Sequence, residues 1–185
     1  MDKTSDSHPL RIDSIIPLVA HAGTIGMSFC PGKTVIGAFS GGNWVRDLDI
    51  DLSVIKDWQA TEVLTLLEAW ELAEMRVDNL GRRVQELGMT WNWLEIPDGG
   101  IPQGDVADKW HAIRNDLIKR IAQGESIFIH CKGGLGRTGT LATELLLCFG
   151  EDLDSAMKRV RLARPGTIET PEQEKYLRGI ACNAL

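Results

Sequence analysis

The stretch SIFIHCKGGLGRTGTL, Ser126–Leu141, decides the fold because three kinds of local structure follow one another in it. SIFIH is a short apolar run of the kind that forms a buried strand. CKGGLG is rich in glycine, which interrupts regular structure. Arg137 then begins a run that predicts a helix to about Phe149. A strand, a glycine-rich turn and a helix, in this order, form the arrangement in which α/β proteins bind anions.

The same alternation of strands and helices extends along the chain. Apolar runs predict strands within 24–39, where Pro31 and Gly32 divide two pieces, and at 61–68, 89–97 and 126–130. Helical spacing and end signals predict helices at 46–60, 77–88, 105–122, 137–149, 153–163 and 171–180. We therefore expect an α/β three-layer sandwich, with a central, mostly parallel sheet of about four to five strands flanked by helices.

Composition narrows the class of protein. The chain has 185 residues, of which 43% are hydrophobic and 25% charged, and this fits one soluble domain over 1–185. Segment 1–11 is polar and lacks the apolar stretch of a secretory signal, so we expect it to be flexible. The net charge of -6 disfavours nucleic acid and anionic membranes as partners. The four cysteines form no Cys-x-x-Cys pair, so we expect free thiols and a cytoplasmic location.

The chemistry of the glycine-rich turn follows from its residue types. Successive backbone N–H groups can all point inward and form a nest for an anion, and glycines keep side chains out of the ligand's way. The guanidinium of Arg137 can grip two oxygens of a phosphate. Cys131 lies in the same positive field, which stabilises its thiolate form. A thiolate under a bound phosphate is a nucleophile for phosphoryl transfer.

Three other interpretations are weaker. A nucleotide-binding loop requires Gly-x4-Gly-Lys-[Ser/Thr], whereas GMSFCPGKT has five residues between its glycines, and Pro31 removes an amide. A metal site at His130 and Cys131 is disfavoured because adjacent residues of a strand point to opposite faces, so we expect neither metal nor cofactor. A purely structural turn leaves the spacing between Cys131 and Arg137 unexplained.

At this point the residues resemble a known family. HCKGGLGRTG, 130–139, resembles the H-C-x5-R-[S/T] signature of the cysteine-dependent protein tyrosine phosphatase superfamily. IPDGGIP, 96–102, resembles the general-acid loop of its dual-specificity branch, in particular of enzymes similar to cyclin-dependent kinase-associated phosphatase. ARPGTIETPEQEKYL, 163–177, resembles the glutamine loop of that branch. The resemblance runs from about Gly23 to Leu177 and implies a single phosphatase domain with a protein tyrosine phosphatase-like fold.

The resemblance implies three catalytic residues. Cys131 is the nucleophile, and Arg137 holds the phosphoryl oxygens through the transition state. Asp98 matches the general acid, which protonates the leaving oxygen and then activates water. On local sequence alone Asp98 is better explained as a turn residue before Gly99, and Asp105 is the next candidate for the acid.

The resemblance also implies supporting roles around these three. The backbone amides that bind phosphate belong to Lys132, Gly133, Gly134, Leu135 and Gly136, together with the side chain of Arg137. His130 orders the loop, and the Thr138 hydroxyl assists the departing thiolate. Glu169 and Gln173 fall in the glutamine loop, where many relatives carry Gln at the position of Glu169.

The function implied is that of a metal-independent protein phosphatase. It would hydrolyse phosphotyrosine, and phosphoserine or phosphothreonine as well, on a phosphorylated protein partner. The alternatives are a non-protein phosphomonoester as substrate, an inactive phosphate-binding module, and a sulfurtransferase. Leu135 stands where phosphoinositide phosphatases carry a second basic residue, which disfavours a lipid substrate. Whether Cys30 is a redox partner of Cys131 stays open at this point.

Overall fold

The centre of the molecule is a mixed sheet. The computed structural model describes residues 2–37 and 41–183, and within them five strands lie in the order β2-β3-β8-β6-β7. Their bounds are Asp13–Ile15 for β2, Ile25–Phe29 for β3, Ala60–Thr65 for β6, Thr90–Trp93 for β7 and Ser126–Cys131 for β8. Strands β3, β8, β6 and β7 are parallel, and β2 pairs antiparallel with β3 at the edge.

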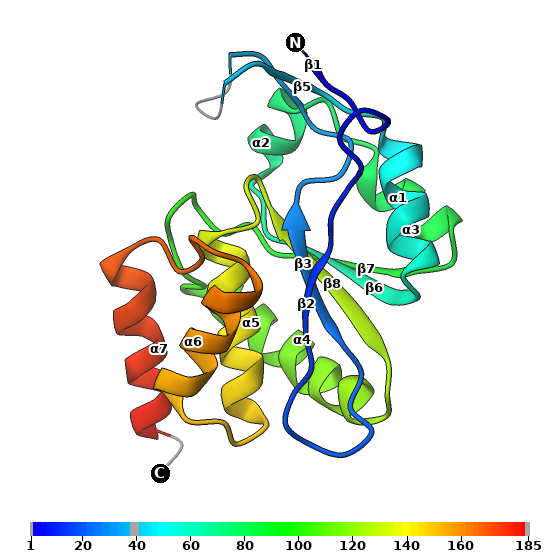
Figure 1. Ribbon diagram of the computed structural model, residues 1–185. Coiled ribbons are helices and arrows are strands. Elements are labelled where there is room, and N and C mark those ends of the chain that lie inside the picture. Colours follow the sequence, from blue (N-terminus) through cyan, green and yellow to red (C-terminus); the bar gives the residue numbers. More distant parts are fainter. Residues whose placement is uncertain (1, 38–40, 184–185) are drawn as a thin grey trace.

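Helices cover both faces of this sheet (Figure 1). One layer contains α1, Leu48–Asp57, and α3, Leu80–Glu86. The other contains α4, Asp105–Ala122, and α5, Gly136–Cys148, with α6, Leu153–Ala163, and α7, Pro171–Asn183, packed against α5. The three-layer α/β sandwich expected from the sequence is therefore confirmed, and each helix predicted from the sequence is present.

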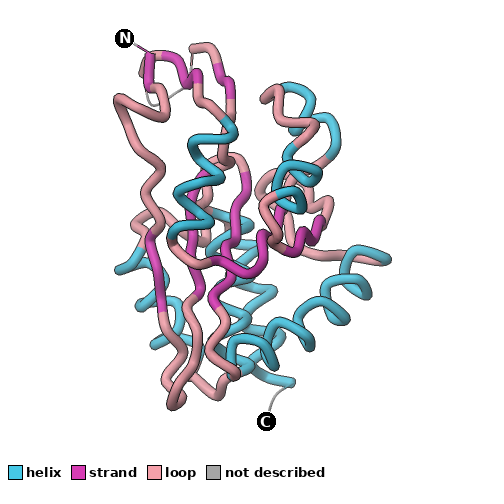
Figure 2. Tube along the Cα trace, turned by 90° about the vertical axis from the view of Figure 1, so that its right-hand side faces the viewer, coloured by secondary structure: helices cyan, strands magenta, loops and turns pink. Residues whose placement is uncertain are grey.

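Strands β1, Asp2–Lys3, β2 and β5, Asn43–Val45, and one short helix were not predicted. Strand β4, Thr34–Val35, belongs to the second strand piece expected within 24–39, of which residues 38 and 39 lie outside the described residues. Strands β1, β5 and β4 form a small second sheet in the order β1-β5-β4. Figure 2 shows these strands gathered at the end of the molecule that holds the N-terminus. Helix α2, Ala69–Glu74, follows β6 after a short turn, where the sequence predicts a strand to 68.

Segment 1–11, expected to be flexible, makes several contacts over its described residues. Ser5 and Leu10 are buried. The guanidinium of Arg46 donates hydrogen bonds to the carbonyl oxygens of Thr4, at 3.3 Å, and His8, at 2.7 Å. These contacts join the segment to the body of the domain.

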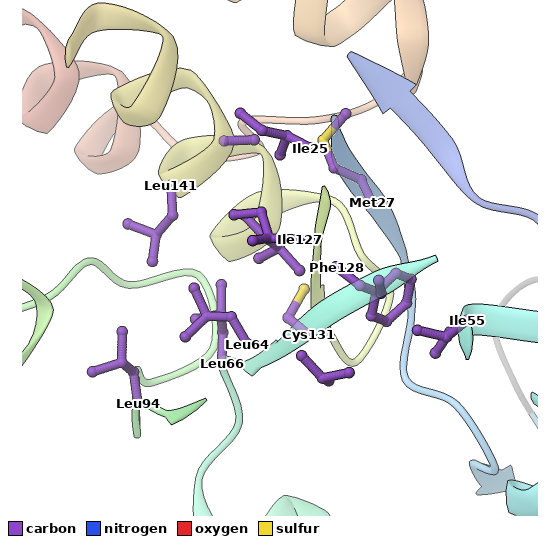
Figure 3. Packing of buried hydrophobic residues seen from close by; sticks show 14 of the residues in the cluster. Ile25, Met27, Ile55, Leu64, Leu66, Leu94, Ile127, Phe128, Cys131 and Leu141 are labelled. Carbon is purple, nitrogen blue, oxygen red and sulfur yellow. The ribbon is translucent and has the colours of Figure 1, made fainter. Parts of the chain in front are cut away.

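The main core lies between the sheet and its two helix layers. Figure 3 shows Cys131 beside Leu64, Leu66 and Phe128, so the last residue of β8 is part of the hydrophobic packing. Trp110, on the apolar face expected for α4, is fully buried. Trp70, in α2, is by contrast largely exposed, with 57% of its surface accessible.

Candidate active site

The cysteine of the signature lies where β8 ends. The side chain of Cys131 is buried, with 3% exposed, and the backbone N–H of Gly134 donates to its sulfur at 3.2 Å. Because β8 is central in the parallel part of the sheet, its carboxyl end is the position at which α/β folds place ligands. The ammonium of the next residue, Lys132, forms an exposed ion pair with Glu74 of α2 at 3.0 Å.

The glycines of the turn are required by close contacts. Gly134 has a φ of +70°, and a Cβ there would lie 2.0 Å from the carbonyl oxygen of Ser28 in β3. A Cβ on Gly139, in the first turns of α5, would lie 2.5 Å from the side chain of Thr167. The turn therefore lies directly on β3, and α5 lies directly on the segment before α7, at positions where only glycine fits.

Cations hold the carbonyl groups of the turn. Lys33 donates from its ammonium to the carbonyl of Lys132 at 3.1 Å. Arg164 donates to the carbonyls of Gly133, at 2.8 Å, and Gly134, at 2.6 Å. Because the C=O and N–H of a trans peptide point in opposite directions, the amides of residues 133–135 are turned away from these cations. The same arrangement orients successive N–H groups in an anion nest.

Arg137 is the centre of a buried network. Its side chain, in the first turn of α5, donates to both carboxylate oxygens of Glu71, at 2.6 and 2.9 Å, and to the carbonyl of Ile96 at 2.9 Å. It also donates to Asp98 at 2.9 Å. Burial opposes the charge of the guanidinium, but the hydrogen bonds to Glu71 raise the pKa of Arg137 above its ordinary value. The structure thus brings Arg137 and Asp98 together.

Glu71 is the principal residue that sequence reasoning missed. It lies in α2 and is 1% exposed. Besides its pair with Arg137, its carboxylate accepts a hydrogen bond from the backbone N–H of Glu68 at 2.9 Å, which completes a capping box. The spacing of Glu68 and Glu71 was the one available signal, because a helix of six residues is too short to show apolar periodicity.

The acid loop is joined to the segment before α7. Asp98 is largely exposed, with 74% of its side chain accessible. The hydroxyl of Thr170 donates to the carbonyl of Gly99 at 3.0 Å, and the side-chain amide of Gln173 donates to that of Gly100 at 3.3 Å. The loop that carries the proposed acid and the loop that resembles the glutamine loop therefore lie in direct contact.

Glu169 makes a contact that the sequence does not reveal. Its carboxylate accepts a hydrogen bond from the backbone N–H of Gly136 at 2.7 Å, at the N-terminus of α5. A carboxylate is favoured there by the helix dipole. The amide of Gly136, expected to bind phosphate, is thus bonded to Glu169 in this structure.

His130 and Thr138 are both fully buried. The Nε2 atom of His130 is 2.8 Å from the hydroxyl of Thr65, which accepts a hydrogen bond from the indole of Trp91 at 2.9 Å. Burial lowers the pKa of His130 to about 3, with Arg137 acting in the same direction, so the ring is neutral at physiological pH. The hydroxyl oxygen of Thr138 has no hydrogen-bond partner among the described residues.

Cys30 is a free thiol beside the same turn. Its backbone N–H donates to the carbonyl of Lys132 at 3.4 Å, and its side chain is buried. Burial raises the pKa of Cys30 well above its usual range. Its thiolate is therefore scarce at neutral pH, which disfavours Cys30 as an attacking group.

Together these contacts gather groups that a dianionic phosphate would require. The Cys131 sulfur accepts a hydrogen bond from an amide of the turn, the guanidinium of Arg137 is held by buried Glu71, and the carboxylate of Asp98 lies on the exposed side. This is the arrangement of the cysteine-dependent tyrosine and dual-specificity protein phosphatases.

Solved structures agree with this class. Kinase associated phosphatase, crystallised with serine in place of its catalytic-site cysteine, has a TM-score of 0.79 to this chain, covers 96% of it and is 25% identical. The comparison covers 98% of that structure. Tk-PTP in its active form has a TM-score of 0.65 and 26% identity, over 87% of this chain and 93% of the other.

Sequence comparison then places the chain in a family. The family described as Cyclin-dependent kinase inhibitor 3 (CDKN3) matches residues 13–158, and the chain belongs to it. Cyclin-dependent kinase inhibitor 3 of Rattus norvegicus is 32% identical over 135 residues, which are 71% of this chain and 62% of the relative. The protein of the same name from Homo sapiens is 30% identical, with the same coverage. The chain thus spans about 62% of the length of these curated relatives.

The resemblance stated from the sequence is therefore confirmed at the level of the family. In the part of the chain that the structure describes, no helix combines the length and the hydrophobicity that crossing a bilayer requires.

Proposed function

We propose that this chain hydrolyses phosphate monoesters of proteins through a cysteinyl-phosphate intermediate, acting on phosphotyrosine and on phosphoserine or phosphothreonine. The observation that carries the proposal is the orientation of the turn at residues 132–134, where Lys33 and Arg164 hold three successive carbonyls. The amides on the other side are thereby oriented in advance, with that of Gly134 already donating to the Cys131 sulfur, so phosphoryl oxygens can be bound with little reorganisation.

Phosphate binding begins with an exchange at Arg137. Glu71 and Ile96 occupy one side of the guanidinium, while the Nη2 atom also donates to Asp98, which is exposed and can move. A phosphoryl group takes the place of the Asp98 oxygen on Nη2, and a second phosphoryl oxygen meets the Nε–H on the same edge. The planar fork then holds two oxygens while Glu71 fixes its orientation.

In the first chemical step, the Cys131 thiolate attacks phosphorus and forms an S–P bond. The P–O bond to the substrate breaks, and its electron pair stays on the leaving oxygen. Protonated Asp98, displaced from Arg137 but still on the loop fixed by Thr170 and Gln173, donates a proton to that oxygen. The charge on the three equatorial oxygens is stabilised by the amides and by Arg137.

In the second step, water attacks phosphorus as Asp98 accepts one of its protons. The S–P bond breaks, inorganic phosphate forms and the thiolate returns to Cys131. The hydroxyl of Thr138 is buried and unpartnered among the described residues, so it can donate to the sulfur as negative charge returns there. Gln173, which is bonded to Gly100 of the acid loop, is the side chain we assign to orienting this water.

The site favours a protein substrate over a phosphoinositide. Lys132 is the basic side chain of the turn, and its ammonium is paired with Glu74. Leu135, at the other position where a lipid phosphatase would carry a cation, is apolar. Names of relatives point the same way, since they include Tyrosine-protein phosphatase CDC14 of Saccharomyces cerevisiae, 30% identical over 93 residues, half of this chain.

The experiment is turnover of an aryl phosphate in the presence of a metal chelator. Wild-type protein should hydrolyse the ester, and Cys131→Ser should not, because a hydroxyl is a far weaker nucleophile at neutral pH. Cys148→Ser, which changes an exposed thiol of α5, is the control and should keep wild-type activity. Acid quenching during turnover should trap phosphate on the wild-type protein only.

Residual turnover by Cys131→Ser above one part in about a thousand would contradict the cysteinyl-phosphate mechanism, since loss of a nucleophile costs at least this much in other enzymes. Vanadate binding by the same variant shows whether the amides and Arg137 form an anion site independently of the chemistry.

A further inference from the structure

A cavity of about 700 Å³ adjoins the proposed acid. It lies between the acid loop, the start of α4 and the start of α7. The residues that line it are Glu95, Pro97, Asp98, Gly99, Gly100, Ile101, Gln103, Val106, Thr170, Pro171 and Glu172. Because Asp98 belongs to both, the cavity and the phosphate site form one continuous surface.

The charges of this cavity are all of one sign. Glu95, Asp98 and Glu172 line it, and none of its lining residues, all of which the structure describes, is Lys, Arg or His. The charge of Asp98 is balanced by Arg137. Glu95 and Glu172 have no cationic partner among the described residues, so the cavity holds two uncompensated negative charges.

In each of these two carboxylates, one oxygen accepts a hydrogen bond that orients the side chain. Glu95 accepts a hydrogen bond from the backbone N–H of Ala69 at 2.9 Å, and Glu172 accepts one from the side chain of Gln103 at 3.2 Å. The other oxygen of each side chain has no hydrogen-bond partner in the described part of the chain. Both carboxylates are therefore oriented and still have acceptor capacity for a ligand.

The remaining walls are partly apolar. Pro97, Ile101, Val106 and Pro171 lie between the two carboxylates. A Lys or Arg side chain has this same division, with an apolar stem and a charged end, and such side chains bury the stem along apolar surface.

We propose that this cavity binds a Lys or Arg side chain of the substrate protein, close in sequence to its phosphorylated residue. The proposal rests on the proposed function and specifies its substrate class: phosphoproteins with a basic residue beside the phosphorylated one. The phosphate site would bind the phosphorylated residue of a peptide, and the acidic cavity would bind a basic side chain of the same peptide. Since the whole chain has a net charge of -6, a basic residue in the substrate also offsets its repulsion of a phosphopeptide.

The test uses phosphotyrosine peptides in which one Lys is moved along the positions on both sides of the phosphorylated residue, with norleucine as the uncharged replacement. Affinity is measured with Cys131→Ser protein, which binds without turnover, and kcat/KM with the wild type. At the best position we expect Lys to improve both about tenfold at low salt, and the gain to shrink at high salt.

The double variant Glu95→Gln, Glu172→Gln keeps the size of both side chains and an acceptor oxygen for each existing hydrogen bond. It should lose most of the preference for Lys, while Asp154→Asn, an exposed acid in the first turn of α6, should keep it. Thermal unfolding and aryl phosphate turnover, which involve no basic side chain, show that the variants are folded.

The proposal is overturned if no position of Lys improves affinity, or if the double variant keeps the full preference while folded. It fails separately from the proposed function. Lys-dependent binding without any turnover by wild-type protein would refute the enzymatic function and retain the cavity's specificity, whereas turnover without a charge preference would do the reverse.

Discussion

Two arginine–carboxylate pairs in the described part of the chain are buried and bidentate, but they use different edges of the guanidinium: Arg46 bonds Asp51 through Nε and Nη2, and Arg137 bonds Glu71 through Nη1 and Nη2. Arg46 donates two hydrogen bonds to Asp51, both of 2.7 Å, and both side chains are completely buried. Arg137 donates two to Glu71, at 2.6 and 2.9 Å, and these side chains are almost as buried. The Arg46 pair links residues five positions apart, whereas the Arg137 pair links residues 66 positions apart, and in each pair both carboxylate oxygens are hydrogen-bonded.

The two pairs differ in the acceptors that the other N–H groups of each guanidinium contact. The other amine of Arg46 donates to the carbonyls of Thr4 and His8, which are fixed parts of the fold. Arg137 gives one hydrogen bond to Asp98, on an exposed loop. The first guanidinium is committed to structure on all sides, whereas the second keeps one edge for exchange. Arg137 therefore resembles the structural arginine, except that a ligand can replace the Asp98 carboxylate on one edge of its guanidinium.

The largest expected difference between the two pairs is in the free energy of unfolding after the carboxylate of each is neutralised. Asp51→Asn leaves the charge of Arg46 buried without a partner, which we expect to cost about 3–5 kcal/mol in the free energy of unfolding. Glu71→Gln should cost less, because Asp98 still pairs with Arg137 in that variant. Urea unfolding of both variants measures the difference.

Phosphate provides the control for this pair of variants. Inorganic phosphate in the millimolar range should raise the melting temperature of Glu71→Gln, because phosphate pairs with Arg137. The shift that phosphate causes in Asp51→Asn should equal the shift that it causes in wild type. Equal losses of stability in the two variants would remove the distinction between the pairs.

The next effect should be on rate. Arg137→Lys retains the charge but lacks the planar fork, and we expect kcat/KM for an aryl phosphate to fall on the order of a hundredfold or more. Arg46→Lys is the matched change and should lower the melting temperature while kcat stays within about threefold of wild type. A variant Arg137→Lys with near wild-type rate would show that the fork has no catalytic role.

Asp98 should have an effect that depends on the substrate. In Asp98→Asn, esters with a poor leaving group lose the proton that the acid supplies, worth roughly a hundredfold. Esters of nitrophenol-like groups, which tolerate negative charge, should slow much less. Rates for a series of aryl phosphates give the slope against leaving-group pKa, and parallel slopes for variant and wild type would assign Asp98 to the turn alone.

The smallest effect concerns Lys33, whose ammonium bonds the carbonyl of Lys132 in the turn. Its ammonium is 4.7 Å from the ring of Phe29 and 4.4 Å from that of Trp44, and burial lowers its pKa from 10.5 to about 8. The unfolded chain therefore holds more protons between these two values, so the contribution of Lys33 to stability rises with pH across that window and is constant below it.

The measurement is the free energy of unfolding of wild type and Lys33→Met at pH 7 and pH 9.5. Their difference should move in favour of wild type by about 2 kcal/mol at the higher pH. Other groups that titrate in this range contribute to both proteins and cancel in the difference. A difference that is the same at both pH values would place Lys33 in contact with solvent.

How far the sequence predicts this site depends on the length of each signal. The turn from Cys131 to Arg137 is recognisable because its residues are contiguous, and the long helices because apolar positions recur over several turns. Glu71 was missed because α2 has only six residues and its partner Arg137 is 66 positions away. Arg164 and Lys33 were missed as supports of the turn because each bonds backbone carbonyls, and those leave no trace in the sequence.

The small sheet shows the same limit in the fold. Strand β1 has two residues and pairs with β5, so neither strand is long enough to show an alternating pattern. Asp51 is one of two acidic residues in the first turn of α1, which is a common place for exposed acids. Its burial is explained by its ion pair with Arg46, which the sequence does not reveal.

The contact between Asp98 and Arg137 has a consequence for the end of the reaction cycle. Inorganic phosphate, the final product, carries the same oxygens as the substrate group and competes for the same guanidinium edge. Each time the loop returns its carboxylate to Arg137, at 2.9 Å, it occupies the edge that the product must keep in order to remain bound. The side chain proposed to protonate the leaving group would thereby also help to expel the product, so removing its charge should strengthen inhibition by phosphate even as it slows turnover.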